Sequence, residues 1–295
     1  MRYCEESKQN RRGSVRVAVI ALMAVLAIVA LAFAFWPRDE EQSSENSGAG
    51  EKSTDDAGEK SGADTSMSSL PYFEPENQSR YDAYLAQNAT LAPDDAVWMV
   101  NANLDKVRYV DYVVIPDPSD LNVLVNKYNQ LPADYVPDDL VEIDQTKMKA
   151  VAAEALRKMQ ADAKTAGLTF IAQSGYRSYS YQNGLYEGYK KTDPEGADTY
   201  SARPGFSEHQ TGLAVDINKT VSDLSDFVGT PEADWVYGNA YRYGFIVRYT
   251  EANTDITGYM SEPWHIRYIG VAHATKMHDE GIDSYEEYAA KHMSQ

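Results

Sequence analysis

The sequence predicts an α+β fold: a single domain with a mainly antiparallel sheet flanked by helices, behind an N-terminal transmembrane helix. Three observations support this. The chain has 295 residues, 43% of them hydrophobic and 24% charged, as in ordinary globular proteins. Residues 17–36 contain no charged residue. Further along, short strand-like runs are mixed with helical patterns, but without the regular alternation that builds a parallel sheet.

The N-terminal segment joins a basic stub to an apolar run. Residues 1–16 carry a net charge of +3, and the apolar residues 17–36 follow directly. At a helical rise of about 1.5 Å per residue the run spans about 30 Å, the thickness of a bilayer's hydrocarbon core. Because the basic side comes first, the positive-inside rule predicts a cytoplasmic stub at 1–16 and an extracellular remainder. We therefore expect a single-pass cell-membrane protein.

A cleaved signal peptide is the alternative interpretation of the apolar run. Ala32-Phe33-Ala34 resembles a cleavage site, and cleavage there would give a secreted protein. The run is longer than the roughly 7–15 apolar residues of a signal peptide, which favours an uncleaved signal anchor.

An acidic linker separates the apolar run from the folded part. Residues 37–69 have no aromatic residue and a net charge of −6, so they bury too little apolar surface to fold, and we expect a disordered tether. Residues 70–295 are rich in aromatic and aliphatic residues, carry a charge of −15 and are long enough for one core. This acidity argues against nucleic acid as a partner, and the lone Cys4 excludes an intramolecular disulfide framework.

Hydrophobic periodicity predicts the elements of residues 70–295. Strands are expected at 96–101, 121–125, 168–173, 213–217, 245–249 and 264–268. A helix is expected over 148–163, with Gly167 after its C-terminal end, and further helices at 179–189 and 271–279. Two prolines predict a loop over 129–137.

A carboxylate stands where an apolar strand does not tolerate one. Asp216 is flanked by Val215 and Ile217, and a buried carboxylate is unfavourable unless it is paired or bound to a metal. His209 precedes it by seven residues, and Gly212 between them can let the chain turn so that the two side chains meet.

A second histidine and another carboxylate occur together in EPWHIRY (262–268). In strand geometry His265 and Arg267 share one face, and the residues between them share the other. With His209 and Asp216, His265 supplies three ligands of a catalytic zinc site, and Glu262 supplies a base. Spacing alone leaves the alternative that these are unrelated residues. Three further histidines near the C-terminal end lack such a carboxylate framework, and we assign them no role.

An arginine follows another predicted strand, in SGYRS (174–178). Placed at a strand-to-helix junction, Arg177 can offer a bidentate fork to a carboxylate or a polarised carbonyl. A structural salt bridge is the alternative.

Three motifs together resemble the VanY-type D-alanyl-D-alanine carboxypeptidases and their LD-carboxypeptidase relatives, which are zinc peptidases. They are SGYRS (174–178), SEHQTGLAVD (207–216) and EPWHIRY (262–268), in the family's order. The resemblance covers roughly residues 80–290. It implies a site with one Zn²⁺ per chain, held by His209, Asp216 and His265.

The resemblance also implies the other roles at this site. Glu262 matches the catalytic base, and Arg177 matches the arginine that contacts the substrate and stabilises the developing oxyanion. Gln182 and Ser207 match positions that help bind the peptide end.

The implied reaction is the removal of the C-terminal D-alanine from a peptidoglycan stem peptide, outside the cytoplasmic membrane. Cleavage of a pentapeptide stem (DD) and of a tetrapeptide stem (LD) both remain open. One alternative is an endopeptidase with the same zinc chemistry. Another is a non-catalytic zinc-containing wall-binding module, against which Glu262 argues because a structural zinc site needs no base beside it.

Overall fold

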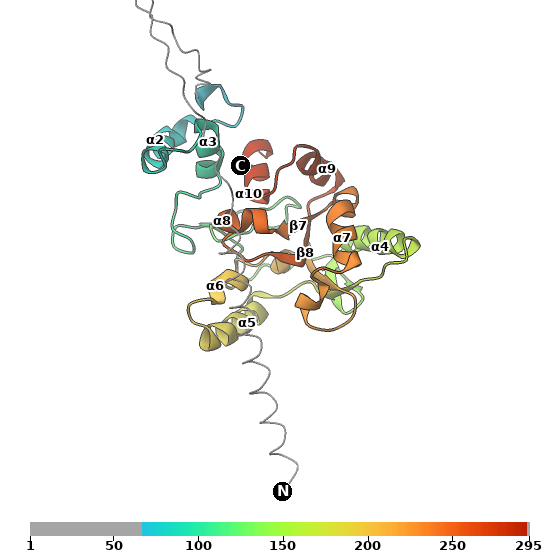
Figure 1. Ribbon diagram of the computed structural model, residues 1–295. Helices are drawn as coiled ribbons and strands as arrows, with labels where there is room; N and C mark the ends of the chain where they lie inside the picture. Colours follow the sequence, from blue (N-terminus) through green and yellow to red (C-terminus); the bar gives the residue numbers. More distant parts are fainter. Residues whose placement is uncertain (1–66, 294–295) are drawn as a thin grey trace, which may run out of the picture. The chain divides into compact units, whose positions relative to one another are not determined.

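A four-stranded antiparallel sheet organises the computed structural model, which describes residues 67–293 (Figure 1). Its strands lie in the order β5-β6-β8-β7, and each neighbouring pair is antiparallel. Along the sheet they are Ile171–Ser174, Ala214–Asn218, Glu262–Tyr268 and Phe245–Tyr249. The expected α+β class with a mainly antiparallel sheet is confirmed.

Two small strand pairs and nine α-helices of the described part complete the fold. β1 (Val113–Val114) pairs in parallel with β2 (Asn129–Gln130), and β3 (Leu140–Ile143) pairs antiparallel with β4 (Thr146–Lys149). The longer helices are α2 (Gln78–Gln87), α3 (Pro93–Asn101), α4 (Ala150–Thr165), α5 (Tyr179–Thr192), α7 (Pro231–Asn239), α9 (Val271–Asp279) and α10 (Tyr285–His292). The helices expected at 179–189 and 271–279 are therefore confirmed, and the first of them runs three residues further.

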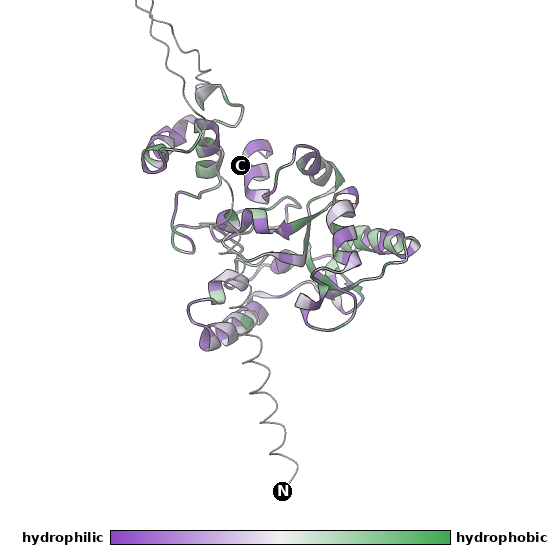
Figure 2. Cartoon of the chain, viewed as in Figure 1, coloured by the Kyte–Doolittle hydropathy of each residue, from purple (hydrophilic) through white to green (hydrophobic). Residues whose placement is uncertain are grey.

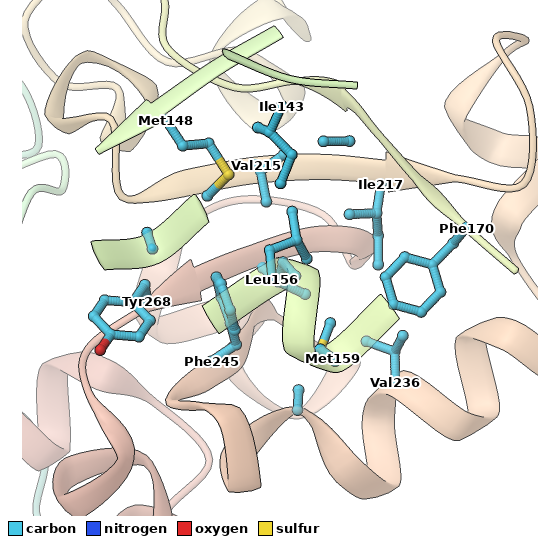
Figure 3. Packing of buried hydrophobic residues seen from close by; sticks show 14 of the residues in the cluster. Ile143, Met148, Leu156, Met159, Phe170, Val215, Ile217, Val236, Phe245 and Tyr268 are labelled. Atoms are coloured by element: carbon cyan, nitrogen blue, oxygen red, sulfur yellow. The ribbon is translucent and has the colours of Figure 1, made fainter. Parts of the chain in front are cut away.

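Helix α4 packs on one face of the sheet and forms the main core with it. Leu156 and Met159 of α4 lie against Val215 and Ile217 of β6, and all four side chains are fully buried (Figure 3). In Figure 2 the hydrophobic residues concentrate on the strands beside α4 and α7. Because side chains alternate along a strand, the residue between the two buried aliphatic ones of β6, Asp216, points to the opposite face.

The end of α4 is set by the glycine that the sequence indicates. Gly167 has a φ of +79°, its N–H donates to the Lys164 carbonyl, and the N–H of Leu168 donates to the Ala163 carbonyl. This pair of bonds is a Schellman motif, which needs a left-handed residue such as glycine. The helix begins at Ala150, two residues later than expected, because Met148 belongs to β4.

The strand expected at 96–101 is wrong, because these residues form the body of α3. The helix begins with Pro93 at its first turn, followed by Asp94 and Asp95, and this is a favourable helix start. The helix is buried on several sides, since Ala96, Val97, Trp98 and Val100 are all buried. Its sequence is therefore a continuous apolar run, which is also the pattern of a buried strand.

The strand expected at 121–125 is also wrong. The guanidinium of Arg267 donates from Nη2 to the carbonyls of Leu121 and Val123, at 3.2 and 2.8 Å, so a side chain takes the place of a neighbouring strand. The loop expected at 129–137 is interrupted at its start by the two residues of β2. The strand expected at 168–173 begins only at Ile171, after the Schellman motif has ended.

The predicted N-terminal stub and the apolar run at 17–36 lie outside the described residues, as does most of the expected linker. Between residues 67 and 293 no helix is both long and apolar enough to cross a membrane. Met67–Ser69, which fall in the expected linker, form a short helical turn, and Met67 packs against the cluster under α2 and α3.

Replacing Leu156 with Ala tests the packing of α4 on the sheet. We expect the free energy of unfolding to fall by about 2–5 kcal/mol, because the residue is fully buried and its loss leaves a cavity. Val151 on the same helix is 37% exposed, and Val151→Ala should change the free energy by roughly 0.5 kcal/mol or less. Urea unfolding measures both; equal losses would contradict the packing described.

Candidate active site

The sheet register brings two of the predicted site residues together. Asp216 of β6 and His265 of β8 are direct cross-strand partners, and both point away from the α4 core. His209 reaches the same point from the short helical turn Glu208–Thr211 that precedes β6. One ligand atom from each of His209, Asp216 and His265 lies within 4.8 Å of the others, and all three residues are buried.

Gly212 makes this approach of His209 to β6 geometrically feasible, as expected. It caps the turn with a φ of +69°, and its N–H donates to the His209 carbonyl at 3.2 Å. A Cβ at this position would lie 2.9 Å from Cδ2 of Leu140. Both the left-handed backbone and the close approach therefore favour glycine here.

His209 presents one unengaged ring nitrogen to the cluster. Its Nδ1 lies 2.7 Å from the Gly175 carbonyl, to which it donates, and this leaves Nε2 as the acceptor nitrogen. Within the described chain Nε2 has no hydrogen-bond partner, and it lies 3.4 Å from Oδ2 of Asp216. Burial, helped by the positive charge of Arg177, lowers the pKa of His209 to about 4, so the ring is neutral at pH 7 and suited to bind a metal.

His265 lies between two carboxylates. Its Nδ1 is 3.1 Å from Oδ1 of Asp216, and its Nε2 is 3.2 Å from Oε2 of Glu208. Burial by itself would lower the pKa of His265, but the hydrogen bonds to these carboxylates raise it to about 9. Burial likewise opposes the ionised form of Asp216, but the two histidines hold its pKa well below the ordinary value.

This donor set fits a zinc ion. Two imidazole nitrogens and one carboxylate oxygen converge, and the outward-facing nitrogen of each histidine is occupied by a hydrogen-bond partner. Such outer partners fix the ring orientation of metal-binding histidines. Three protein ligands leave one position for water or substrate, as in catalytic zinc sites.

Glu262 lies beside the cluster, outside the set of three ligands. Its Oε2 is 3.9 Å from Nδ1 of His265, and its side chain is 14% exposed. Burial is the main cause that raises the pKa of Glu262 to about 7, with Asp216 adding to the shift and His265 opposing it. A carboxylate with such a pKa exchanges protons readily near neutral pH, although a bound cation would lower the value.

A cleft of about 430 Å³ opens onto the cluster, and all seven predicted site residues line it. Arg177 is the only Lys or Arg among the described residues of its lining. The guanidinium lies 3.6 Å from Oδ2 of Asp216, and Nε has no hydrogen-bond partner in the described part. The alternative of a structural salt bridge therefore accounts for only part of the guanidinium.

Gln182 and Ser207 lie on the wall of the cleft. Gln182 of α5 is 2% exposed and donates from Nε2 to the Ala202 carbonyl at 2.8 Å, while its Oε1 lacks a partner among the described residues. That oxygen can accept an N–H from a bound peptide. Ser207 is buried directly before the turn that carries His209.

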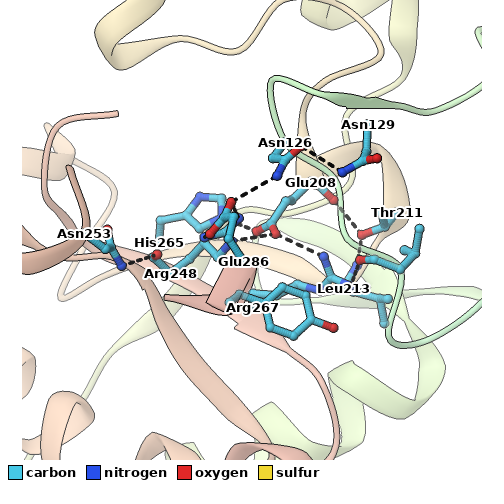
Figure 4. A network of polar contacts seen from close by, with 12 residues as sticks. Asn126, Asn129, Glu208, Thr211, Leu213, Arg248, Asn253, His265, Arg267 and Glu286 are labelled. Atoms are coloured by element: carbon cyan, nitrogen blue, oxygen red, sulfur yellow. Dashed lines mark hydrogen bonds and ion pairs between the residues drawn. The ribbon is translucent and has the colours of Figure 1, made fainter. Parts of the chain in front are cut away.

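The sequence interpretation missed the residues behind the metal cluster. Glu208 is fully buried and pairs with Arg248 and Arg267, and Arg248 also pairs with Glu286 of α10 (Figure 4). Burial would raise the pKa of Glu208, but the two arginines hold it well below the ordinary range. A signal was present in the sequence, because FIVRY and WHIRY each place an arginine at an inner position of a predicted strand, where a charge needs a buried partner. None of the three histidines left without a role lines the cleft within the described part.

A buried cluster of two histidines and an aspartate, with a separate carboxylate and an arginine on one cleft, is typical of a metal-dependent hydrolase. A family model described as VanY, D-alanyl-D-alanine carboxypeptidase, matches residues 145–271. The putative carboxypeptidase YodJ of Bacillus subtilis (strain 168) is 40% identical over 191 residues, which are 60% of this chain and 70% of that protein. The chain belongs to the VanY family of D-alanyl-D-alanine carboxypeptidases.

Solved structures agree with this assignment. The LD-carboxypeptidase LdcB, whose structure concerns peptidoglycan recognition, has 39% sequence identity and a TM-score of 0.57, covering 63% of this chain and 92% of its own. The D,D-dipeptidase VanXYg, in complex with a D-Ala-D-Ala phosphinate analogue, has 36% identity and a TM-score of 0.54, covering 58% and 71%. The bifunctional D-Ala-D-Ala dipeptidase and carboxypeptidase VanXYC of Enterococcus gallinarum is 30% identical over 58% of this chain and 96% of its own.

Asp216→Asn tests the metal cluster. We expect loss of stoichiometric zinc binding, because the variant replaces the only anionic ligand of the three by a neutral amide. Equilibrium dialysis with metal analysis measures bound zinc. His278→Ala is the matched control, since that histidine does not line the cleft, and it should bind zinc as the parent chain does. Full zinc occupancy in Asp216→Asn would refute the assignment.

Proposed function

We propose that the protein is a zinc-dependent carboxypeptidase that removes the C-terminal D-alanine from peptidoglycan stem peptides. The observation that carries this proposal is the convergence of His209, Asp216 and His265 on one point, with Glu262 beside them at the end of a cleft. The names of the related proteins support the choice of substrate, because they refer to D-Ala-D-Ala and to peptidoglycan.

His209, Asp216 and His265 would hold one Zn²⁺ per chain. When bound, the ion would polarise the scissile carbonyl and lower the pKa of water in the open position. The chain's own contribution is to fix the two rings, through the Gly175 carbonyl behind one and Glu208 behind the other. The rings then need no rearrangement when the metal enters.

Glu262 would move the proton during hydrolysis. Its carboxylate lies near the ligand atoms, and among residues 67–293 its closest ion-pair partner is His265, at 3.9 Å. It can therefore accept a proton from the attacking water at Oε2 and then deliver it to the leaving amine. Its partial burial in the cleft wall supports this role, because a raised pKa favours both halves of the transfer.

Arg177 would bind the negative charge of the substrate and of the transition state. An exopeptidase must recognise a terminal carboxylate, and Arg177 is the single Lys or Arg in the described lining of the cleft. Its guanidinium also approaches the metal cluster, where charge develops on the carbonyl oxygen. The unpaired Oε1 of Gln182 would accept a peptide N–H, and the Ser207 hydroxyl would complete the binding of the peptide end.

The proposed location follows from the segments that precede the domain. Residues 1–16 would be cytoplasmic, 17–36 would anchor the protein in the membrane, and 37–69 would tether the domain of residues 70–295 outside the cell. Peptidoglycan stem peptides lie on that side of the membrane, which supports this arrangement.

Glu262→Gln tests the role of the base. We expect kcat to fall by about 10²–10⁴-fold, the usual contribution of a general base, while zinc remains bound because Glu262 is not a ligand. Release of D-alanine from a stem peptide measures kcat, and metal analysis measures zinc. Unchanged turnover, or a loss of activity together with the metal, would contradict the assignment.

The specificity can be resolved by comparing two stem peptides. A DD-carboxypeptidase removes D-alanine from the pentapeptide, and an LD-carboxypeptidase removes it from the tetrapeptide; mass spectrometry of the products distinguishes them. In either case a chelator should abolish the reaction and added Zn²⁺ should restore it. Release from neither peptide by the zinc-loaded protein would refute the proposed function, and cleavage at an internal bond would indicate an endopeptidase.

A further inference from the structure

The site has a fully buried carboxylate that the proposed reaction does not use. Glu208 precedes the ligand His209 in the same helical turn, and its side chain has no exposed surface. Oε1 accepts hydrogen bonds from Nε of Arg248 at 2.9 Å and from Nη1 of Arg267 at 3.1 Å. Both oxygens are engaged, since Oε2 lies 3.2 Å from Nε2 of His265.

The charges around Glu208 are matched one to one. Arg248 makes a bidentate contact with Glu286 of α10, at 3.0 and 2.6 Å, and so has a carboxylate of its own. Arg267 has Glu208 as its carboxylate partner and otherwise donates to backbone carbonyls. Glu208 is therefore held as an anion at a fixed position, with two buried arginines on the side away from His265.

A fixed anion behind His265 determines which ring nitrogen faces the ligand cluster. In the neutral ring, which is the form that binds a metal, Nε2 donates its proton to Glu208, so Nδ1 carries the lone pair and points to the side of Asp216, 3.1 Å away. A reversed ring would leave Glu208 without its donor in a place that solvent does not reach.

We propose that Glu208 is a positioning residue for the metal centre: it selects the His265 ring orientation and tautomer that offer Nδ1 to the metal, and it increases the basicity of that nitrogen. This inference rests on the zinc site of the proposed function. It assigns one turn of the chain two tasks, since His209 is a ligand and Glu208 fixes the second histidine ligand.

Glu208→Gln in the full-length chain tests the proposal, with Glu286→Gln as the matched control. Each change removes one negative charge from the same buried network, but only Glu208 touches His265. Competition of the apoprotein with a chromophoric chelator measures the zinc Kd. We expect the zinc Kd to rise by about 10–100-fold in Glu208→Gln, the usual effect of losing an outer partner of a ligand. In Glu286→Gln the Kd should stay at the parent value.

A second readout follows the ligand geometry directly. In the Co²⁺-substituted protein, the visible absorption bands of the metal should shift in Glu208→Gln and remain unchanged in Glu286→Gln. Equal Kd values for the two variants, or a parent-like Kd and spectrum in Glu208→Gln, would overturn the proposal. A parent chain that binds no zinc would instead refute the proposed function, so the two failures are distinguishable.

A pair of double variants keeps the test decisive if the single ones do not fold. Glu208→Gln with Arg267→Gln, and Glu286→Gln with Arg248→Gln, each remove one matched pair of charges and leave the other. The zinc Kd of the variant without Glu208 and Arg267 should be about 10–100-fold higher than that of the variant without Glu286 and Arg248. Equal Kd values would show that Glu208 serves only the stability of the fold.

Discussion

The matching of buried charges on one face of the sheet is the constraint on which the rest of this structure depends. The face opposite α4 carries Asp216, His265 and Arg267, and solvent reaches none of them freely. Removing one partner of such a buried pair typically lowers stability by about 3–5 kcal/mol. The elements around this face are consequently arranged to supply partners: the turn before β6 brings Glu208, and α10 brings Glu286.

The geometry of the site follows from this arrangement and from strand alternation. Because β6 and β8 each present apolar residues to α4, their remaining side chains meet on the other face, with Asp216 opposite His265. On the inner side of His265, a metal ion would balance the negative charge of Asp216. On the outer side, the ring nitrogen has Glu208 as its partner. Structure and proposed chemistry therefore use the same contacts.

The sequence predicts the site better than it predicts the surrounding fold. Asp216 stands out because a carboxylate in an apolar strand requires a partner. The remaining site residues are identified from their places in or beside the three family motifs. Glu208 cannot be found in this way, since a glutamate in a polar turn looks exposed until the two arginines that bury it are located in space. The strand expected at 96–101 is a helix because its short apolar run does not distinguish a strand from a helix that is buried on two sides, here by the preceding helix α2 and by the distant α10.

The contact between Arg248 and Glu286 has a consequence for the order in which the protein assembles. Every residue that lines the cleft precedes position 269, yet the charge network behind the cleft closes only when α10 has docked. A nascent chain that has emerged through β8 thus contains the whole site but leaves Arg248 without its bidentate partner. The charge network behind the cleft is therefore complete only in a chain that includes α10, although α10 contributes no residue to the described lining of the cleft.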